Sequence, residues 1–122
     1  MAFVLWLEGR KMPAKAREIF HQAEKEQVLI YIPALVFAEL GYLAEKNKID
    51  TNLFEVRHAL LKNKAIKEYP ISFETINIAF QIDDIPELHD RIIASVAKEL
   101  DAKIITNDPD IENSAHVNTM WK

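Results

Sequence analysis

The sequence predicts an α/β protein with a mostly parallel sheet. Short apolar runs of strand length alternate with longer amphipathic segments of helical period. The chain has 122 residues, of which 49% are hydrophobic and 28% are charged, as expected for one folded domain over residues 1–122. Its net charge of −4 argues against binding nucleic acid by bulk charge alone.

Apolar spacing predicts the elements of the first half. Residues 14–27 follow a proline and carry apolar residues at i, i+3, i+4 and i+7, which indicates a helix. The continuous apolar run 28–32 (VLIYI) predicts a strand buried on both faces. A second proline ends it, and a helix is expected over 34–46. Asp50–Thr51 then predicts the cap of a helix whose apolar side spans 53–61.

The second half alternates in the same way. Residues 66–72 suit a short strand and 73–80 a helical stretch. Asp83–Asp84 followed by a proline indicates a helix start, and that helix is expected to run to about residue 101. Residues 103–106 predict a short strand, halted by Asn–Asp–Pro, and 117–121 a weaker last one.

The chain has no cysteine, which excludes disulfides, thiolate zinc sites and cysteine nucleophiles. No apolar run reaches the ~18 residues of a membrane span, and the first residues lack the basic region of a signal peptide. We therefore expect a cytoplasmic protein without membrane association.

Glu39 is the only charge between Val28 and Ala44. On a helix, its neighbours at i−4 and i+4 are Leu35 and Leu43, so the carboxylate projects from an apolar stripe. Such a group is expected to be protonated, paired or bound to a metal. The alternative is a helix rim, where Glu39 reaches water or a lysine.

Asp90 heads a similar stripe, with apolar residues at i+3, i+4, i+7 and i+10. It lies in the first or second turn of its helix, where the macrodipole favours an anion. That effect also accounts for an acidic first turn with no further purpose, which is how we interpret Asp84 and Glu87.

Asp108 follows the strand KIIT, and ligands of open α/β sheets bind beyond the carboxyl ends of strands. Taken singly, Asp108 is better explained by an Asp–Pro turn signal, and Asp110 in the same loop ranks second as a site residue. Glu39, Asp90 and Asp108 are predicted to converge at one sheet edge. Carboxylate oxygens without cysteine or a histidine pair suit Mg²⁺ or Mn²⁺.

The segments PALVFAEL, PELHDRIIASVA, AKIITND and a terminal VNTMW, in this order, resemble the PIN domain, specifically the VapC-like toxins of toxin–antitoxin pairs. The resemblance implies a metal-dependent ribonuclease with a parallel sheet between helices, commonly a homodimer, inhibited by a cognate antitoxin. It places family carboxylates on Glu39, Asp90 and Asp108, and the family's active-site hydroxyl on Thr106.

The family pattern begins with a strand that ends in a catalytic Asp. This chain instead starts with MAFVLWLEGRK, which resembles the family segment on the carboxyl side of that Asp. The expected fold is therefore a PIN-like sheet whose central first strand is missing or replaced. Residues 2–7 are the material available to fill the gap, and we expect them to stay helical as in the family.

Three functions are compatible with these residues. The first is Mg²⁺- or Mn²⁺-dependent hydrolysis of RNA, with phosphate contacts from Arg10, Lys11, Lys15 and Arg17, although a solvated helix face explains these cations equally well. The second is a catalytically impaired module that engages an antitoxin or RNA without cleavage. The third is an unrelated metal phosphohydrolase acting on small substrates.

Overall fold

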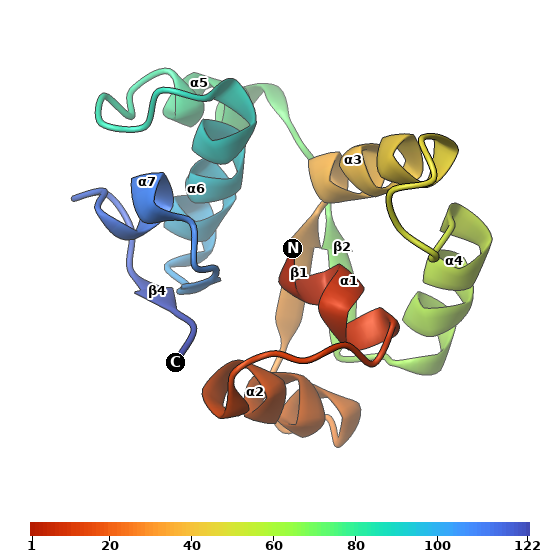
Figure 1. The fold of residues 1–122 in the computed structure, drawn as a ribbon. Coiled ribbons are helices and arrows are strands. Elements are labelled where there is room, and N and C mark those ends of the chain that lie inside the picture. Colours follow the sequence, from red (N-terminus) through yellow and green to blue (C-terminus); the bar gives the residue numbers. More distant parts are fainter. The chain divides into compact units, whose positions relative to one another are not determined.

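The computed structural model describes all of residues 1–122, and the chain divides into two units, Met1–Tyr69 with Lys122, and Pro70–Trp121 (Figure 1). The first unit holds α1 (Ala2–Leu7), α2 (Ala14–Glu24), β1 (Ile30–Pro33), α3 (Ala34–Glu45), α4 (Leu53–Lys62) and β2 (Ile66–Tyr69). The second holds α5 (Phe73–Ala79), α6 (Leu88–Leu100), β3 (Ile104–Ile105), α7 (Pro109–Glu112) and β4 (Thr119–Met120). None of the seven helices combines the length and apolar character that a membrane span requires.

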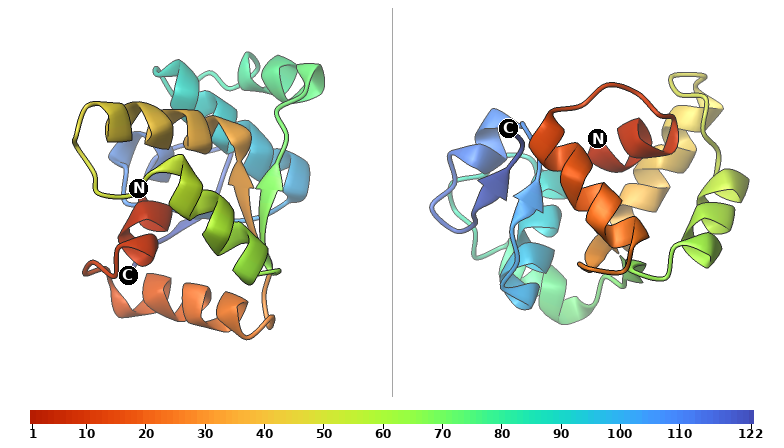
Figure 2. Two further views of the ribbon diagram at one scale, coloured as in Figure 1. Left: turned by 90° about the vertical axis from the view of Figure 1, so that its right-hand side faces the viewer. Right: turned by 90° about the horizontal axis from the view of Figure 1, so that it is seen from below.

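The strands form two separate pairs, and both pairs are parallel, in agreement with the predicted α/β class. β1 pairs with β2 in the first unit and β3 with β4 in the second, and the views in Figure 2 show each pair side by side. No strand of this chain joins the two pairs. Residues 2–7, the candidate substitute for a first strand, are helical, which confirms the prediction for that segment.

Helix α1 ends because of Gly9. Its backbone has a φ of +63°, a left-handed conformation that glycine adopts more readily than residues with a Cβ. The Gly9 N–H donates to the Trp6 carbonyl and the Arg10 N–H to the Leu5 carbonyl, at 3.2 and 2.8 Å. This is a Schellman motif, which satisfies the last carbonyls of the helix. A local sequence signal therefore ends α1 after two turns or less.

An aromatic cluster holds the helices of the first unit together. Trp6 of α1 stacks on Phe20 of α2 with ring centroids 5.4 Å apart, and Phe3 contacts Phe37 of α3 edge-on at 6.2 Å. The indole N–H of Trp6 donates to Glu24 at 2.9 Å, so the polar group of this half-buried ring is satisfied. Leu40 of α3 is fully buried in the same unit.

Glu8 fastens α1 to the loop before α4. Its Oε2 accepts hydrogen bonds from the Asp50 N–H, the Thr51 N–H and the Thr51 hydroxyl, at 3.0, 2.9 and 2.7 Å. These bonds, the Thr51 hydroxyl first, hold the pKa of Glu8 below its ordinary value of 4.5. The prediction that Asp50–Thr51 caps α4 is wrong, because Asn52 is the N-cap and accepts the Glu55 N–H.

Strand β1 differs from the expectation of burial on both faces. Ile30 and Ile32 are buried, whereas Tyr31 is 37% exposed and packs edge-on against Tyr69 of β2. The physical reason is that a sheet of two strands has few elements to cover its second face. An apolar run alone does not distinguish one buried face from two.

In the second unit, a small core of Ile82, Ile85 and Ala94 packs against Ile104 of β3 and Val117. Helix α6 begins later than predicted, after Pro86, with Glu87 as its N-cap. The core therefore connects α6, β3 and the segment that precedes β4, which positions the loop that follows β3.

Candidate functional site

The loop after β3 holds Thr106 and Asp108, two of the predicted site residues. The Asp108 N–H donates to the Thr106 hydroxyl oxygen at 3.1 Å, so the two residues share one turn. The Asp108 carboxylate caps α7, because its Oδ1 accepts the N–H groups of Asp110 and Ile111 at 2.9 and 3.4 Å. Asp108 thus lies in the turn that the Asp–Pro signal indicates, and its Oδ1 is the capping oxygen of a short helix that the sequence patterns do not predict. Asp110 lies exposed in the first turn of α7.

Asp90 lies in the first turn of α6, as predicted. Its backbone N–H donates to the capping Glu87 carboxylate at 2.8 Å, and its side chain is half-buried. The apolar residues that follow at helical spacing include the buried Ala94 and Ala97. The carboxylate therefore heads the packed face of α6, close to the positive end of the helix dipole.

Glu39 lies in the middle of α3, the helix that leaves β1 at its carboxyl end. Val36 and Leu40 form the buried side of the helix, while Glu39 is half-buried, as are Leu35 and Leu43 one turn away on either side. The predicted apolar stripe around Glu39 is thus a boundary stripe between the buried and exposed sides of α3.

The donor chemistry of these residues suits a hard divalent cation. Glu39, Asp90, Asp108 and Thr106 are all half-buried and offer only oxygen atoms, which Mg²⁺ and Mn²⁺ prefer. Thr106 and Asp108 are brought together by a direct hydrogen bond, and Asp90 belongs to the same unit. Glu39 belongs to the other unit, so convergence of all three carboxylates stays a prediction.

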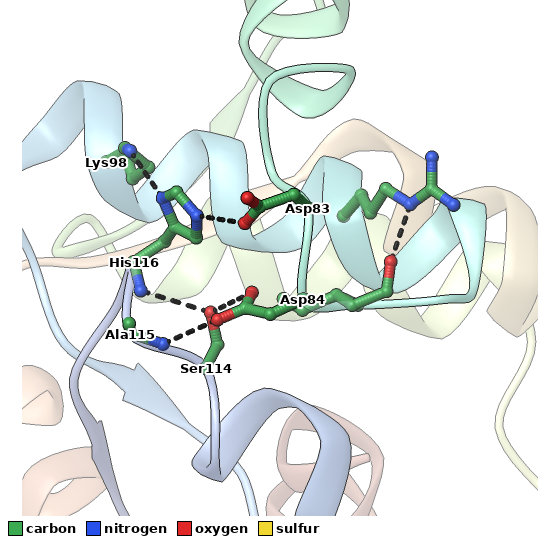
Figure 3. Close-up of polar contacts among 8 residues, drawn as sticks. Asp83, Asp84, Lys98, Ser114, Ala115 and His116 are labelled. Atoms are coloured by element: carbon green, nitrogen blue, oxygen red, sulfur yellow. Dashed lines mark hydrogen bonds and ion pairs between the residues drawn. The ribbon is translucent and has the colours of Figure 1, made fainter.

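A second polar cluster, which the sequence patterns do not predict, consists of Asp83, Asp84 and His116 (Figure 3). One potential ligand atom of each lies within 4.8 Å of the others. The His116 Nε2 lies 3.0 Å from Asp83 Oδ1, and the Lys98 ammonium lies 3.1 Å from His116 Nδ1. Because an ammonium only donates, Nδ1 is the acceptor and Nε2 carries the proton donated to Asp83.

Asp84 completes this cluster by holding the loop before β4. Its carboxylate accepts the Ser114 hydroxyl and the Ala115 N–H, both at 2.7 Å. The Ala115 N–H is the main cause of the lowered pKa of Asp84, and the bond from His116 lowers the pKa of Asp83. Every potential ligand group already has a partner within the chain, so the cluster holds the loop before α6 against the loop before β4.

No local sequence pattern predicts this cluster, because His116 is separated from Asp83 by 33 positions. The acid pair with its proline predicts a helix start, which is wrong for Asp84, because α6 begins only after Glu87. Only a sign in the sequence that the two loops are neighbours would have identified the contact.

A comparison with protein families matches residues 2–117 to the model of the PIN domain. A search of curated proteins found no significant match to this chain. The family match covers nearly the whole sequence and includes Glu39, Asp90, Thr106 and Asp108.

Proposed function

Because the chain belongs to the PIN-domain family, we propose that it is a metal-dependent endoribonuclease similar to the toxin of a VapBC-type toxin–antitoxin module. PIN domains are typically metal-dependent nucleases. The observation that carries the proposal is the family match over residues 2–117, which extends across both units and all four candidate residues.

In the proposed site, Glu39, Asp90 and Asp108 hold Mg²⁺ or Mn²⁺ through their carboxylates. The metal, when bound, lowers the pKa of a water ligand and stabilises the charge of phosphodiester displacement. The hydroxyl oxygen of Thr106 accepts the Asp108 N–H, so its own proton is available to a water or a phosphate oxygen. The capping bonds on Asp108 Oδ1 keep that carboxylate at the end of β3.

The proposed partners follow from the same family. They are an RNA substrate, a cognate antitoxin protein and a second copy of the chain in a homodimer, and the proposed location is the cytoplasm. A catalytically impaired module that engages antitoxin or RNA is the second candidate. Its support is the role of Asp108 as the N-cap of α7, which explains that carboxylate without any metal.

The test is cleavage of a single-stranded RNA oligonucleotide by the full chain, with Mn²⁺, with Mg²⁺ and in excess EDTA. We expect cleavage only with a divalent ion, and a loss of at least about 100-fold on Asp90→Asn, which keeps the shape of the side chain but removes its charge. Asp110→Asn is the matched control and is expected to keep cleavage within about twofold, because its exposed carboxylate lies outside the proposed ligand set.

Calorimetric titration with Mn²⁺ provides a readout that does not depend on turnover. We expect weaker Mn²⁺ binding for Asp90→Asn than for Asp110→Asn. Cleavage that persists in EDTA, or equal Mn²⁺ binding by both variants, would contradict the metal site. RNA binding without any cleavage by the unaltered chain would favour the impaired module.

A further inference from the structure

Positive charge in this acidic protein is densest in one short stretch, and a second, looser acid-free stretch with four cations lies between Glu55 and Glu68. Arg10, Lys11, Lys15 and Arg17, which we call the basic segment, supply four of the 15 lysines and arginines within eight positions. No acidic residue lies between Glu8 and Glu18, although the whole chain carries a net charge of −4. The segment is therefore the most densely basic part of the sequence.

The fold presents all four cations to solvent. The segment comprises the loop after α1 and the first turns of α2, and each of the four side chains is exposed. Met12 and Ala16, which alternate with them, are 7% and 0% exposed. These two anchors hold the backbone of the segment against the first unit, so the cations lie on a fixed support.

Three of these four cations form no ion pair within the protein. Arg10 lies 3.4 Å from the Glu8 carboxylate, whose other oxygen is engaged by Asp50 and Thr51. Lys11, Lys15 and Arg17 form no salt bridge. Glu18, at i+3 from Lys15, is within helical reach but makes no ion pair with it.

Stabilisation of helix α2 does not explain why the basic segment is positively charged. A lysine in the first turn is repelled by the positive end of the helix dipole, and acidic residues are favoured there. The first turn of α2 holds no acidic residue, and its N-cap, Pro13, provides no side-chain hydrogen bond. Lys15 therefore weakens the start of α2, which is the opposite of what a stabilising surface charge does.

We propose that the basic segment binds the phosphodiester backbone of single-stranded RNA, an inference that rests on the proposed ribonuclease function and names how its substrate is held. Unpaired lysines and arginines on a supported surface are the groups that neutralise phosphates and release counterions. The segment carries no aromatic residue on which a base would stack, so the contact reads the backbone and not the sequence.

The test compares two triple variants of the full chain. Lys11→Gln/Lys15→Gln/Arg17→Gln removes the unpaired cations, and Lys48→Gln/Lys64→Gln/Lys67→Gln removes three exposed lysines elsewhere in the same unit. Both variants have the same change in charge. Glutamine is a good helix former, and removing Lys15 relieves the dipole repulsion, so unfolding will not account for a loss in the first variant.

Affinity for a fluorescent single-stranded RNA is measured in EDTA, so that no cleavage occurs, over a range of salt concentrations. Each phosphate contact on a single strand contributes about −0.7 to the slope of log K against log salt. Loss of three contacts is expected to reduce the slope by about 2 and to raise Kd about 100-fold at 0.1 M salt. The control variant is expected to change Kd by less than about threefold.

Equal losses of RNA affinity in both triple variants would overturn the proposal. Unchanged RNA affinity of Lys11→Gln/Lys15→Gln/Arg17→Gln would overturn it too, and this result is expected if the segment binds an acidic protein instead. An unaltered chain that does not bind RNA at ~50 mM salt would overturn it too. Failure of the proposed ribonuclease function gives a different result from failure of this inference. If only the ribonuclease function fails, RNA binding still depends on the basic segment, but no cleavage appears with Mn²⁺ or Mg²⁺.

Discussion

Removal of the Glu8 carboxylate is expected to destabilise the first unit more than any other single change of a surface acid. Glu8→Ala deletes the acceptor of three hydrogen bonds, two of them from Thr51, which is only 3% exposed. The Thr51 N–H and hydroxyl then lose their partner, and an unsatisfied buried donor costs ~1–3 kcal/mol. Because the Glu8 side chain is 10% exposed, water will reach part of the vacated space.

We therefore expect Glu8→Ala to lower the free energy of unfolding by about 2–3 kcal/mol. At roughly 4 °C per kcal/mol for a chain of this size, the melting temperature falls by about 8–12 °C. Glu8→Gln keeps one acceptor oxygen and loses the charge, so about half that effect is expected. Glu18→Ala, an exposed acid on α2, is the control and is expected to stay within about 0.5 kcal/mol.

The dependence on pH separates the charge from packing. The pKa of Glu8 is lowered in the folded chain, so the unfolded chain binds the proton more tightly. The stabilisation is thus fully present above the ordinary value of 4.5 and is lost as the pH falls through the lower folded value. Urea unfolding at about pH 7 and about pH 3 should show the difference between the unaltered chain and Glu8→Gln shrinking in acid. A difference that is equal at both pH values, or a loss below about 0.5 kcal/mol for Glu8→Ala, refutes this reasoning.

Three further predictions concern single residues. Asp108→Asn is expected to abolish metal-dependent cleavage with little change in melting temperature, since Asn caps helices well. Asp108→Ala should lose cleavage and also ~1 kcal/mol of stability. Equal melting temperatures for the Asn and Ala variants would exclude the capping role of Asp108. Asp84→Asn should speed hydrogen exchange of the Ala115 amide at about pH 7. The difference from the unaltered chain should fade as the pH drops through the lowered pKa of Asp84. Unchanged exchange would show that Asp84 does not hold the loop before β4. Leu40→Ala, at a fully buried position of α3, should cost about 2–5 kcal/mol in urea unfolding, and a smaller loss would mean that its surroundings collapse into the cavity.

The local sequence determined where most elements begin and end. Gly9 ends α1 because glycine enters the left-handed conformation more readily than any other residue. Helical periodicity found α2, α3, α4 and α5 to within a few residues, whereas α6 begins later than predicted and α7 was not predicted. Asp108 could be placed beyond a strand, and Asp90 near the start of a helix, because those positions depend only on neighbouring residues. Thr106 was predicted as the last residue of that strand, but β3 ends one residue earlier. The Asp–Pro context predicted a turn at Asp108, but not that this turn begins a short helix with Asp108 as its N-cap.

Tertiary structure decided the contacts between distant segments. Glu8 and Thr51 are 43 positions apart, and Asp83 and His116 are 33 apart, so neither pairing follows from any local pattern. The exposure of Tyr31 likewise depends on how many strands flank β1, which its own apolar run does not reveal. Local conformation depends on residues within about one helical turn, whereas these contacts depend on which loops and strands the whole chain brings together.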